Sequence, residues 1–216
     1  FTKGVGETTE VELLITSPTT AERRLTAKIT PARLDLIINS DSHTPSFYMG
    51  RSLPSGSSQI TAQALMFGDN SGPYTYTWLV NGQNHRNSIG QDNSQITFKP
   101  GLTYSLAVQV EAYNFSGQLV AKKSVKVPLV ESEIHFYESN PLRGLVPNIL
   151  KNPYLFLNDE ITLRGEPYFF SGNSTNYSID WEVDGNEISG DENPLELSLV
   201  KTQENGEALV ELNIIN

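Results

Sequence analysis

The sequence of 216 residues contains no cysteine, so neither a disulfide framework nor a thiolate metal site is available to it. It also lacks any apolar run approaching the ~20 residues of a membrane helix, which predicts no membrane span in this segment. Basic residues are scarce, since 15 Lys and Arg stand against 25 Asp and Glu. Because nucleic-acid binding needs a basic surface that faces the phosphates, this balance argues against nucleic-acid partners.

Catalytic signatures are also missing. No Gly-x-Ser-x-Gly elbow, phosphate-binding loop or dinucleotide fingerprint occurs. The three histidines, His43, His85 and His135, lack metal-ligand spacing and are expected in loops or on the surface. Carboxylates are numerous enough for a glycosidase pair, but small β-domains offer no obvious deep cleft. We therefore expect a protein that is not an enzyme and that needs no cofactor.

One distinctive stretch is present, and it occurs twice: Tyr-Thr-Tyr-Thr-Trp-Leu-Val-Asn-Gly at 74–82 and Tyr-Ser-Ile-Asp-Trp-Glu-Val-Asp-Gly at 177–185. The alternating apolar residues predict a strand with one buried face, and the Asn-Gly or Asp-Gly predicts a hairpin turn. The chain has only two tryptophans, and each lies at the same place in its repeat. We expect the structural core to contain Tyr76, Trp78, Val80, Phe98, Trp181 and Val183.

Short alternating runs of apolar residues recur along the chain, and no long segment keeps a helical period. Roughly seven such runs fall within about 100 residues, with turn residues between them, as in immunoglobulin-like domains. The fold class is therefore predicted to be all-β, as tandem immunoglobulin-like antiparallel β-sandwiches.

The spacing of matching residues predicts where the domains lie. Phe1 and Phe98, Val11 and Val108, and Pro31 and Pro128 are each 97 residues apart. Residues 1–32 are thus expected to be the last two strands of a preceding domain, and 33–129 a complete domain. Residues 130–216 form a second domain that, by this register, lacks its final strand. The joins contain proline and no flexible Gly/Ser run, so we expect stiff junctions in a rod-like array.

Two explanations of that missing strand remain open. The strand lies beyond residue 216 in a longer protein, or another copy donates it, as in strand-complemented fibres. The opening hairpin has the apolar alternation that a donor needs, with Val11, Leu13, Ile15, Leu25 and Ile29. The expected partners are accordingly other domains of the same longer chain or copies of itself.

Three further features allow a functional and a purely structural interpretation. Asp184, Asp191 and Glu192 are candidate Ca²⁺ ligands, but the chain has no Asp-x-Asp-x-Asp-Gly loop, so a solvated acidic edge is the simpler explanation. The second domain is dense in aromatic residues that either stack on sugars or pack in the core and at junctions. Those residues are Tyr154, Phe156, Tyr168, Phe169, Phe170 and Tyr177, and Phe47 and Tyr48 raise the same question. Asn114, Asn173 and Asn176 fit the glycosylation sequon.

The Tyr-x-Trp-x-Val-Asn-Gly strand resembles bacterial immunoglobulin-like and PKD-like domains of exported surface proteins. More specifically, the chain is similar to tandem-domain proteins of candidate-phylum (Parcubacteria-type) bacteria. The likeness rests on Thr-Pro-x-Phe-Tyr-x-Gly at 44–50, Phe-Tyr-Glu-x-Asn-Pro-Leu at 136–142 and residues 160–171. True PKD domains carry a Trp-Asp-Phe-Gly-Asp run that this chain lacks.

This resemblance implies an extracellular or cell-surface location, near pilus or surface-layer machinery. From the tandem array itself we expect a non-catalytic structural segment. The alternatives are a filament or surface-layer subunit that assembles head to tail by strand donation, and a carbohydrate- or protein-binding adhesin module. A surface aromatic patch would favour the adhesin, and concentration-dependent size would favour the subunit.

Replacing Trp78 by Ala should lower the free energy of unfolding by about 3–5 kcal/mol, because truncating a buried tryptophan leaves a large cavity. Urea titration followed by circular dichroism measures this change. A loss below about 1 kcal/mol would show that Trp78 does not lie in the core.

Overall fold

The computed structural model describes residues 4–18, 20–68, 72–88, 93–101, 103–172, 177–190, 192–202 and 206–215. Every named element is a β-strand, and every strand pair with a described register is antiparallel. The all-β class predicted from the sequence is confirmed. The chain divides into two compact units, residues 1–39, 61–98 and 105–128, and residues 40–60, 99–104 and 129–216.

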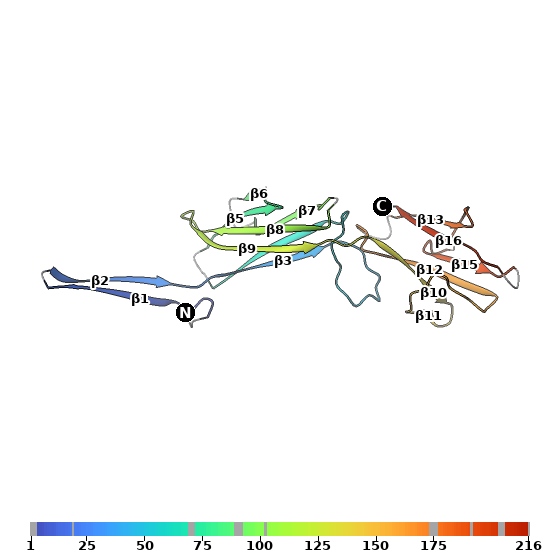
Figure 1. Ribbon diagram of the computed structural model, residues 1–216, viewed down its shortest axis with the longest axis horizontal. Coiled ribbons are helices and arrows are strands. Elements are labelled where there is room, and N and C mark those ends of the chain that lie inside the picture. Colours follow the sequence, from blue (N-terminus) through green and yellow to red (C-terminus); the bar gives the residue numbers. More distant parts are fainter. Residues whose placement is uncertain are drawn as a thin grey trace. The chain divides into compact units, whose positions relative to one another are not determined.

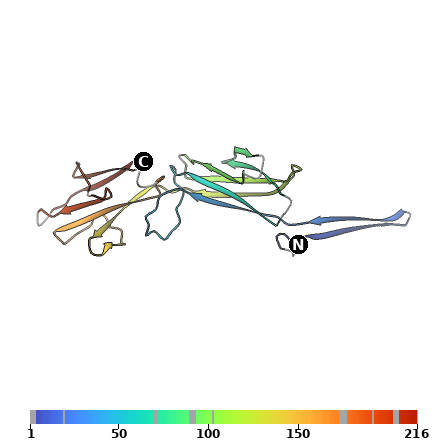
Figure 2. The same ribbon diagram turned by 180° about the vertical axis from the view of Figure 1, so that it is seen from behind.

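Unit 1 contains a separate hairpin, β1–β2, and two further sheets with the strand orders β3-β4-β7 and β6-β5-β8-β9 (Figure 1). Figures 1 and 2 show β1 and β2 side by side along their whole length. The strands of this unit are β1 (Thr9–Ser17), β2 (Thr20–Ile29), β3 (Arg33–Ser40), β4 (Ile60–Phe67), β5 (Thr75–Val80), β6 (Gln83–Ser88), β7 (Gln95–Phe98), β8 (Ser105–Tyr113) and β9 (Leu119–Pro128).

Unit 2 repeats this plan with sheets ordered β11-β10-β12-β15 and β14-β13-β16. Its strands are β10 (Glu133–Asn140), β11 (Gly144–Leu145), β12 (Glu160–Tyr168), β13 (Ser178–Val183), β14 (Asn186–Ile188), β15 (Glu196–Val200) and β16 (Val210–Ile215). The two sheets share one hydrophobic cluster, formed by Ile161, Leu163, Trp181, Leu197 and Leu212. Each of these residues alternates with more exposed ones along its strand, as expected where one face of a sheet is covered.

The two tryptophans occupy equivalent positions. Trp78 on β5 and Trp181 on β13 are 0% and 1% exposed. Each indole N–H donates to a backbone carbonyl, that of Asn93 at 3.2 Å and that of Pro194 at 2.9 Å. A buried indole needs such an acceptor because an unpaired N–H inside a core costs about 1–3 kcal/mol.

The other expected core residues take different degrees of burial. Tyr76 and Phe98 are buried, whereas Val80 and Val183 are half-buried at the ends of their strands. Phe136 lies against Trp181 with ring centroids 5.8 Å apart. Close approach of the two sheets in unit 2 depends on Gly165, because a Cβ there would overlap the side chain of Leu212.

The Asn-Gly and Asp-Gly turns connect three strands rather than two. Asn81 and Asp184 have φ of 51° and 52°, and the glycine that follows each also has positive φ, as a two-residue hairpin turn requires. The backbone N–H of Asn81 donates to Ala107 O at 2.8 Å, and its Oδ1 accepts from Ala107 N at 2.9 Å. Asp184 makes the same two bonds with Leu209, each at 2.9 Å. The turn therefore aligns the tryptophan strand with the next long strand.

Replacing Asn81 by Ala should destabilise the chain by about 1–3 kcal/mol, since the side-chain bond is lost and alanine tolerates positive φ poorly. Asn81→Asp is the matched control, because aspartate performs this role in the second repeat. Thermal and urea unfolding of both variants measures the difference. Equal losses in the two variants would contradict the role given to the side-chain oxygen.

Candidate functional site

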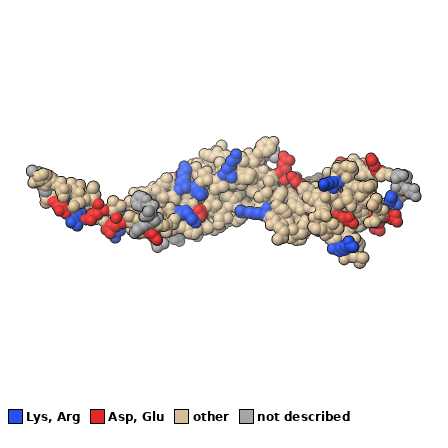
Figure 3. Space-filling model, turned by 60° about the horizontal axis from the view of Figure 1, so that its bottom comes forward, with Lys and Arg blue, Asp and Glu red and all other residues tan. Residues whose placement is uncertain are grey.

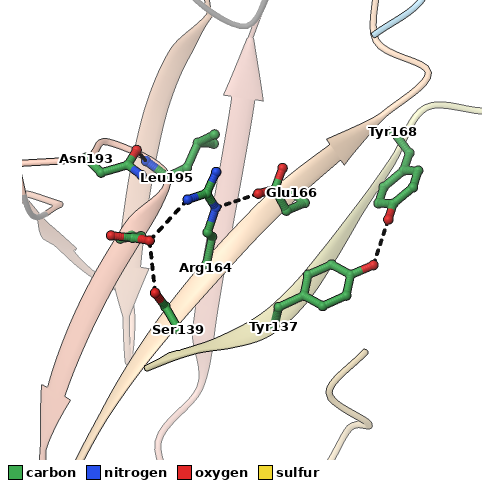
Figure 4. A network of polar contacts seen from close by, with 8 residues as sticks. Tyr137, Ser139, Arg164, Glu166, Tyr168, Asn193 and Leu195 are labelled. Atoms are coloured by element: carbon green, nitrogen blue, oxygen red, sulfur yellow. Dashed lines mark hydrogen bonds and ion pairs between the residues drawn. The ribbon is translucent and has the colours of Figure 1, made fainter. Parts of the chain in front are cut away.

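The face of β10 and β12 that points away from the hydrophobic cluster carries a network of polar side chains (Figure 4). Alternation along the strands places them there, because Arg164, Glu166 and Tyr168 alternate with the core residues of β12. Tyr137 lies opposite Arg164 in the strand register, on the same face. We call this surface the outer face of β10–β12.

Arg164 is the centre of the network. Its Nε donates to Glu166, and its Nη1 donates to Glu196 of β15 at 3.3 Å. Glu196 also accepts from the hydroxyl of Ser139 at 3.1 Å. Glu166 is only 3% exposed, and a carboxylate so deeply buried requires a charged partner. The hydroxyls of Tyr137 and Tyr168 lie 2.7 Å apart beside this group, as Figure 4 shows.

The β3–β4 connection, residues 41–59, packs against the outer face through two aromatic side chains. Phe47 contacts Tyr137 edge-on at 5.3 Å, and Tyr48 contacts Tyr168 edge-on at 5.5 Å. Edge-to-face pairs of this kind contribute about 0.5–1.5 kcal/mol beyond the area they bury. A Cβ at Gly50 would overlap the Tyr48 ring, which explains why glycine follows two residues later.

Backbone hydrogen bonds hold the same connection at two places. The N–H of His43 donates to Phe170 O and the N–H of Phe169 donates to His43 O, both at 2.7 Å. Further along, Val130 N donates to Pro54 O at 2.9 Å. Phe169 has φ of 61°, an unfavourable value for a bulky residue, which the bonds to His43 maintain.

Burial perturbs two titratable groups of this site. It lowers the pKa of His43, an effect that the nearby Glu166 carboxylate partly opposes. Burial and then the hydrogen bond with Tyr137 raise the pKa of Tyr168. Both side chains are therefore uncharged at neutral pH.

A separate groove of about 270 Å³ lies beside the segment that leads into β12. Its walls are Glu138, Glu160, Ile161 and residues 154–158. The hydroxyl of Tyr154 donates a hydrogen bond to Glu138 at 3.2 Å. Burial, and then the charge of the Glu138 carboxylate, raise the pKa of Tyr154. Leu155 and Leu157 are 82% and 83% exposed. The groove thus combines carboxylates with uncovered apolar side chains.

Two of the three residues proposed as calcium ligands, Asp184 and Glu192, lie in the described part of the chain. The Asp184 carboxylate accepts from Leu209 N, Glu192 is exposed, and Asp191 lies outside the described residues. Within the described ranges, no group of three His, Asp or Glu side chains has a geometry that could hold a metal ion. His135 contacts Glu133 at 3.0 Å, and His85 lies against Phe98.

The sequence matches no protein-family model, and no curated protein gives a significant match. In the part of the chain that the structure describes, no helix has the length and apolar character to cross a membrane.

The aromatic residues singled out from the sequence fall into two groups. Tyr168 is buried, and Phe169, Phe170 and Tyr177 are half-buried and contact other rings. Tyr154 and Phe156 both line the groove, and Phe156 also packs against the hydrophobic cluster of unit 2. Of the three sequons, Asn114 lies at an exposed turn where its Oδ1 accepts from Ser116 N and Gln118 N. Asn173 and Asn176 lie outside the described residues.

Sequence reasoning missed the network around Arg164 and the groove beside Tyr154. Alternation in Arg-Gly-Glu at 164–166 places both charges on one strand face, which was a usable signal. The groove had no such signal, because its walls come from β10, β12 and an irregular segment between them.

Replacing Tyr48 by Ala should lower the free energy of unfolding by about 1–3 kcal/mol, because two ring contacts and a half-buried side chain are lost. Met49 is the matched control: it is 98% exposed, so Met49→Ala should change stability by no more than about 0.5 kcal/mol. Urea titration compares the two, and equal effects would contradict the packing of Tyr48.

Stability should fall as the pH drops through the ordinary histidine pKa of ~6.5, since the folded chain disfavours protonated His43 and the unfolded chain does not. His43→Gln should remove the part of this loss that lies between about pH 7 and pH 5.

A second loss of stability begins below about pH 4.5, because hydrogen bonds from Lys122 and Tyr113 lower the pKa of Glu111. Urea midpoints measured across pH test both; an unchanged His43→Gln profile would contradict the first.

Proposed function

We propose that this chain is a non-catalytic structural segment of an extracellular cell-surface or surface-appendage protein, built from tandem immunoglobulin-like (PKD-like) sandwiches. The strand orders of the two units support the sandwich assignment. Strands β3, β4 and β7 correspond to β10, β12 and β15, and strands β6, β5 and β8 to β14, β13 and β16. One sheet of three strands and one of four in each unit supports this assignment, because immunoglobulin-like domains combine sheets of these sizes.

The observation that carries the structural role is the packing of the β3–β4 connection. The aromatic side chains that a binding module would offer to a ligand, Tyr48, Tyr168 and Phe169, contact one another instead. The buried Glu166 is likewise bonded to Arg164 rather than open to solvent. Groups committed to internal contacts in this way stabilise the fold and are not presented to a ligand.

Stretching single molecules by their two ends tests the mechanical role. We expect two separate unfolding events, and residues 129–216 should release about 300 Å of chain at about 3.5 Å per residue. Tyr48→Ala should lower the force of one event, while Met49→Ala should leave both unchanged. A chain that extends without resistance would contradict the proposal.

The proposed location has its own test. Antibodies against the chain should label the surface of intact cells that produce the protein. Labelling that requires permeabilised cells would place the protein inside and exclude the surface role.

A second candidate is a filament or surface-layer subunit, and the edge of β16 favours it. Among the described residues, β16 pairs with β13 alone, whereas the corresponding strand β8 pairs with both β5 and β9. β9, at its sheet edge, carries Lys122, Lys123, Lys126 and Pro128, which discourage further pairing. β16 contains neither lysine nor proline. Light scattering that shows no growth in mass with concentration would exclude this candidate for the isolated chain.

A further inference from the structure

The β1–β2 hairpin has one apolar face that nothing covers among the described residues. The strand register places Val11 opposite Ala27 and Leu13 opposite Leu25. Five of its larger apolar side chains are between 42% and 60% exposed: Val11, Leu13, Ile15, Leu25 and Ile29. Because an isolated two-stranded hairpin is only marginally stable in water, such a face is expected to pack against another surface.

The opposite face of the hairpin is charged and already paired. Arg24 contacts Glu12 at 3.3 Å and Glu22 at 3.0 Å. Figure 3 accordingly shows acidic and basic side chains together along this part of the molecule. Arg23 is different, since it lies opposite Ile15 on the apolar face and makes no ion pair within the described ranges. The apolar face thus carries one available cation.

In unit 1, β9 pairs with the edge of β8. If β2 of another copy paired with the edge of β16 in the same way, it would have to give up its pairing with β1. The pair Val11–Ala27 corresponds to Val108–Val125 of β8–β9, with the same alternation of faces. The edge by which β9 bonds to β8 therefore corresponds to the edge by which β2 already bonds to β1. The intact hairpin has its apolar face, rather than that edge, available for association.

The groove beside Tyr154 has the complementary character. Leu155 and Leu157 offer exposed apolar side chains, and Glu138 and Glu160 contribute two carboxylates to its walls. Charge in this part of the chain is strongly one-sided, since residues 129–216 contain 16 Asp and Glu but only 4 Lys and Arg. The apolar face of the hairpin, with Arg23 beside it, therefore matches the groove both in hydrophobicity and in charge.

We propose that the apolar face of the β1–β2 hairpin of one copy binds the groove lined by Tyr154, Leu155, Leu157 and Glu160 of a second copy. This inference rests on the second candidate function and names the surfaces that join the copies. The two surfaces differ, so the contact is heterologous. Each copy keeps one free hairpin and one free groove, and association continues head to tail unless the rotation between copies closes a ring.

Analytical ultracentrifugation of the full chain from micromolar to millimolar concentration tests this contact. The wild-type mass should rise with concentration beyond twice the 23.9 kDa of one chain. Leu13→Glu with Leu25→Glu should keep the chain monomeric, and so should Leu155→Glu with Leu157→Glu. The matched controls are Leu14→Glu on the charged hairpin face and Leu142→Glu, which is 95% exposed and outside the groove. Both controls should still associate.

Mixing the two blocked variants gives the sharpest test. One variant keeps an intact groove and the other an intact hairpin, so an equal mixture should form dimers and stop there. Arg23→Glu alone should weaken association at least several-fold, and Glu160→Arg in the other copy should restore it. This charge exchange needs no change in the apolar residues, so it does not depend on the folding of the double variants.

Three results would overturn the proposal: a wild-type chain that stays monomeric, assemblies that survive the Leu155 and Leu157 substitutions, or a mixture that never forms dimers. A monomeric chain that still resists stretching and labels the cell surface would remove this inference and leave the structural role intact. Assemblies that survive both pairs of substitutions would point to the edge of β16 instead.

Discussion

Burial of one indole between two antiparallel sheets is the interaction on which each unit depends. A side chain of 150–250 Å² removed from water contributes up to roughly 4–6 kcal/mol. The ring also needs an acceptor for its N–H, and in both units a backbone carbonyl just before the β7 or β15 strand meets it. Trp78 and Trp181 impose both requirements. The strand that carries each indole therefore lies beside the loop whose carbonyl accepts the hydrogen bond from the indole N–H.

The turn that follows each tryptophan extends this arrangement to a third strand. Asn81 and Asp184 use backbone and side chain together to bond the start of the next long strand. Nine neighbouring residues thus supply the tryptophan strand, its hairpin turn and the two bonds that align the next long strand.

Unit 2 shows how residues that look suited to ligand binding serve a structural purpose. Tyr48, Tyr168 and Phe169 form an aromatic layer over a buried carboxylate, and Arg164 neutralises that carboxylate. The positive φ of Phe169 is held by the bond from its own N–H to His43 O and by the bond from His43 N–H to Phe170 O. Apolar side chains stay exposed on the hairpin and beside Tyr154, and these are the two surfaces that we propose join copies of the chain.

The alternation around Trp78 and Trp181 and the two Asx-Gly turns were sufficient to predict an all-β chain with two repeats, because strand period and turn chemistry are local properties. Local pattern did not reveal that Tyr48 lies on Tyr168, since more than a hundred residues separate them in the sequence. The same holds for the pairing of Arg164 with Glu196 and for the groove beside Tyr154. Contacts between distant segments depend on how strands from different parts of the chain are brought together, and only the tertiary structure decides that.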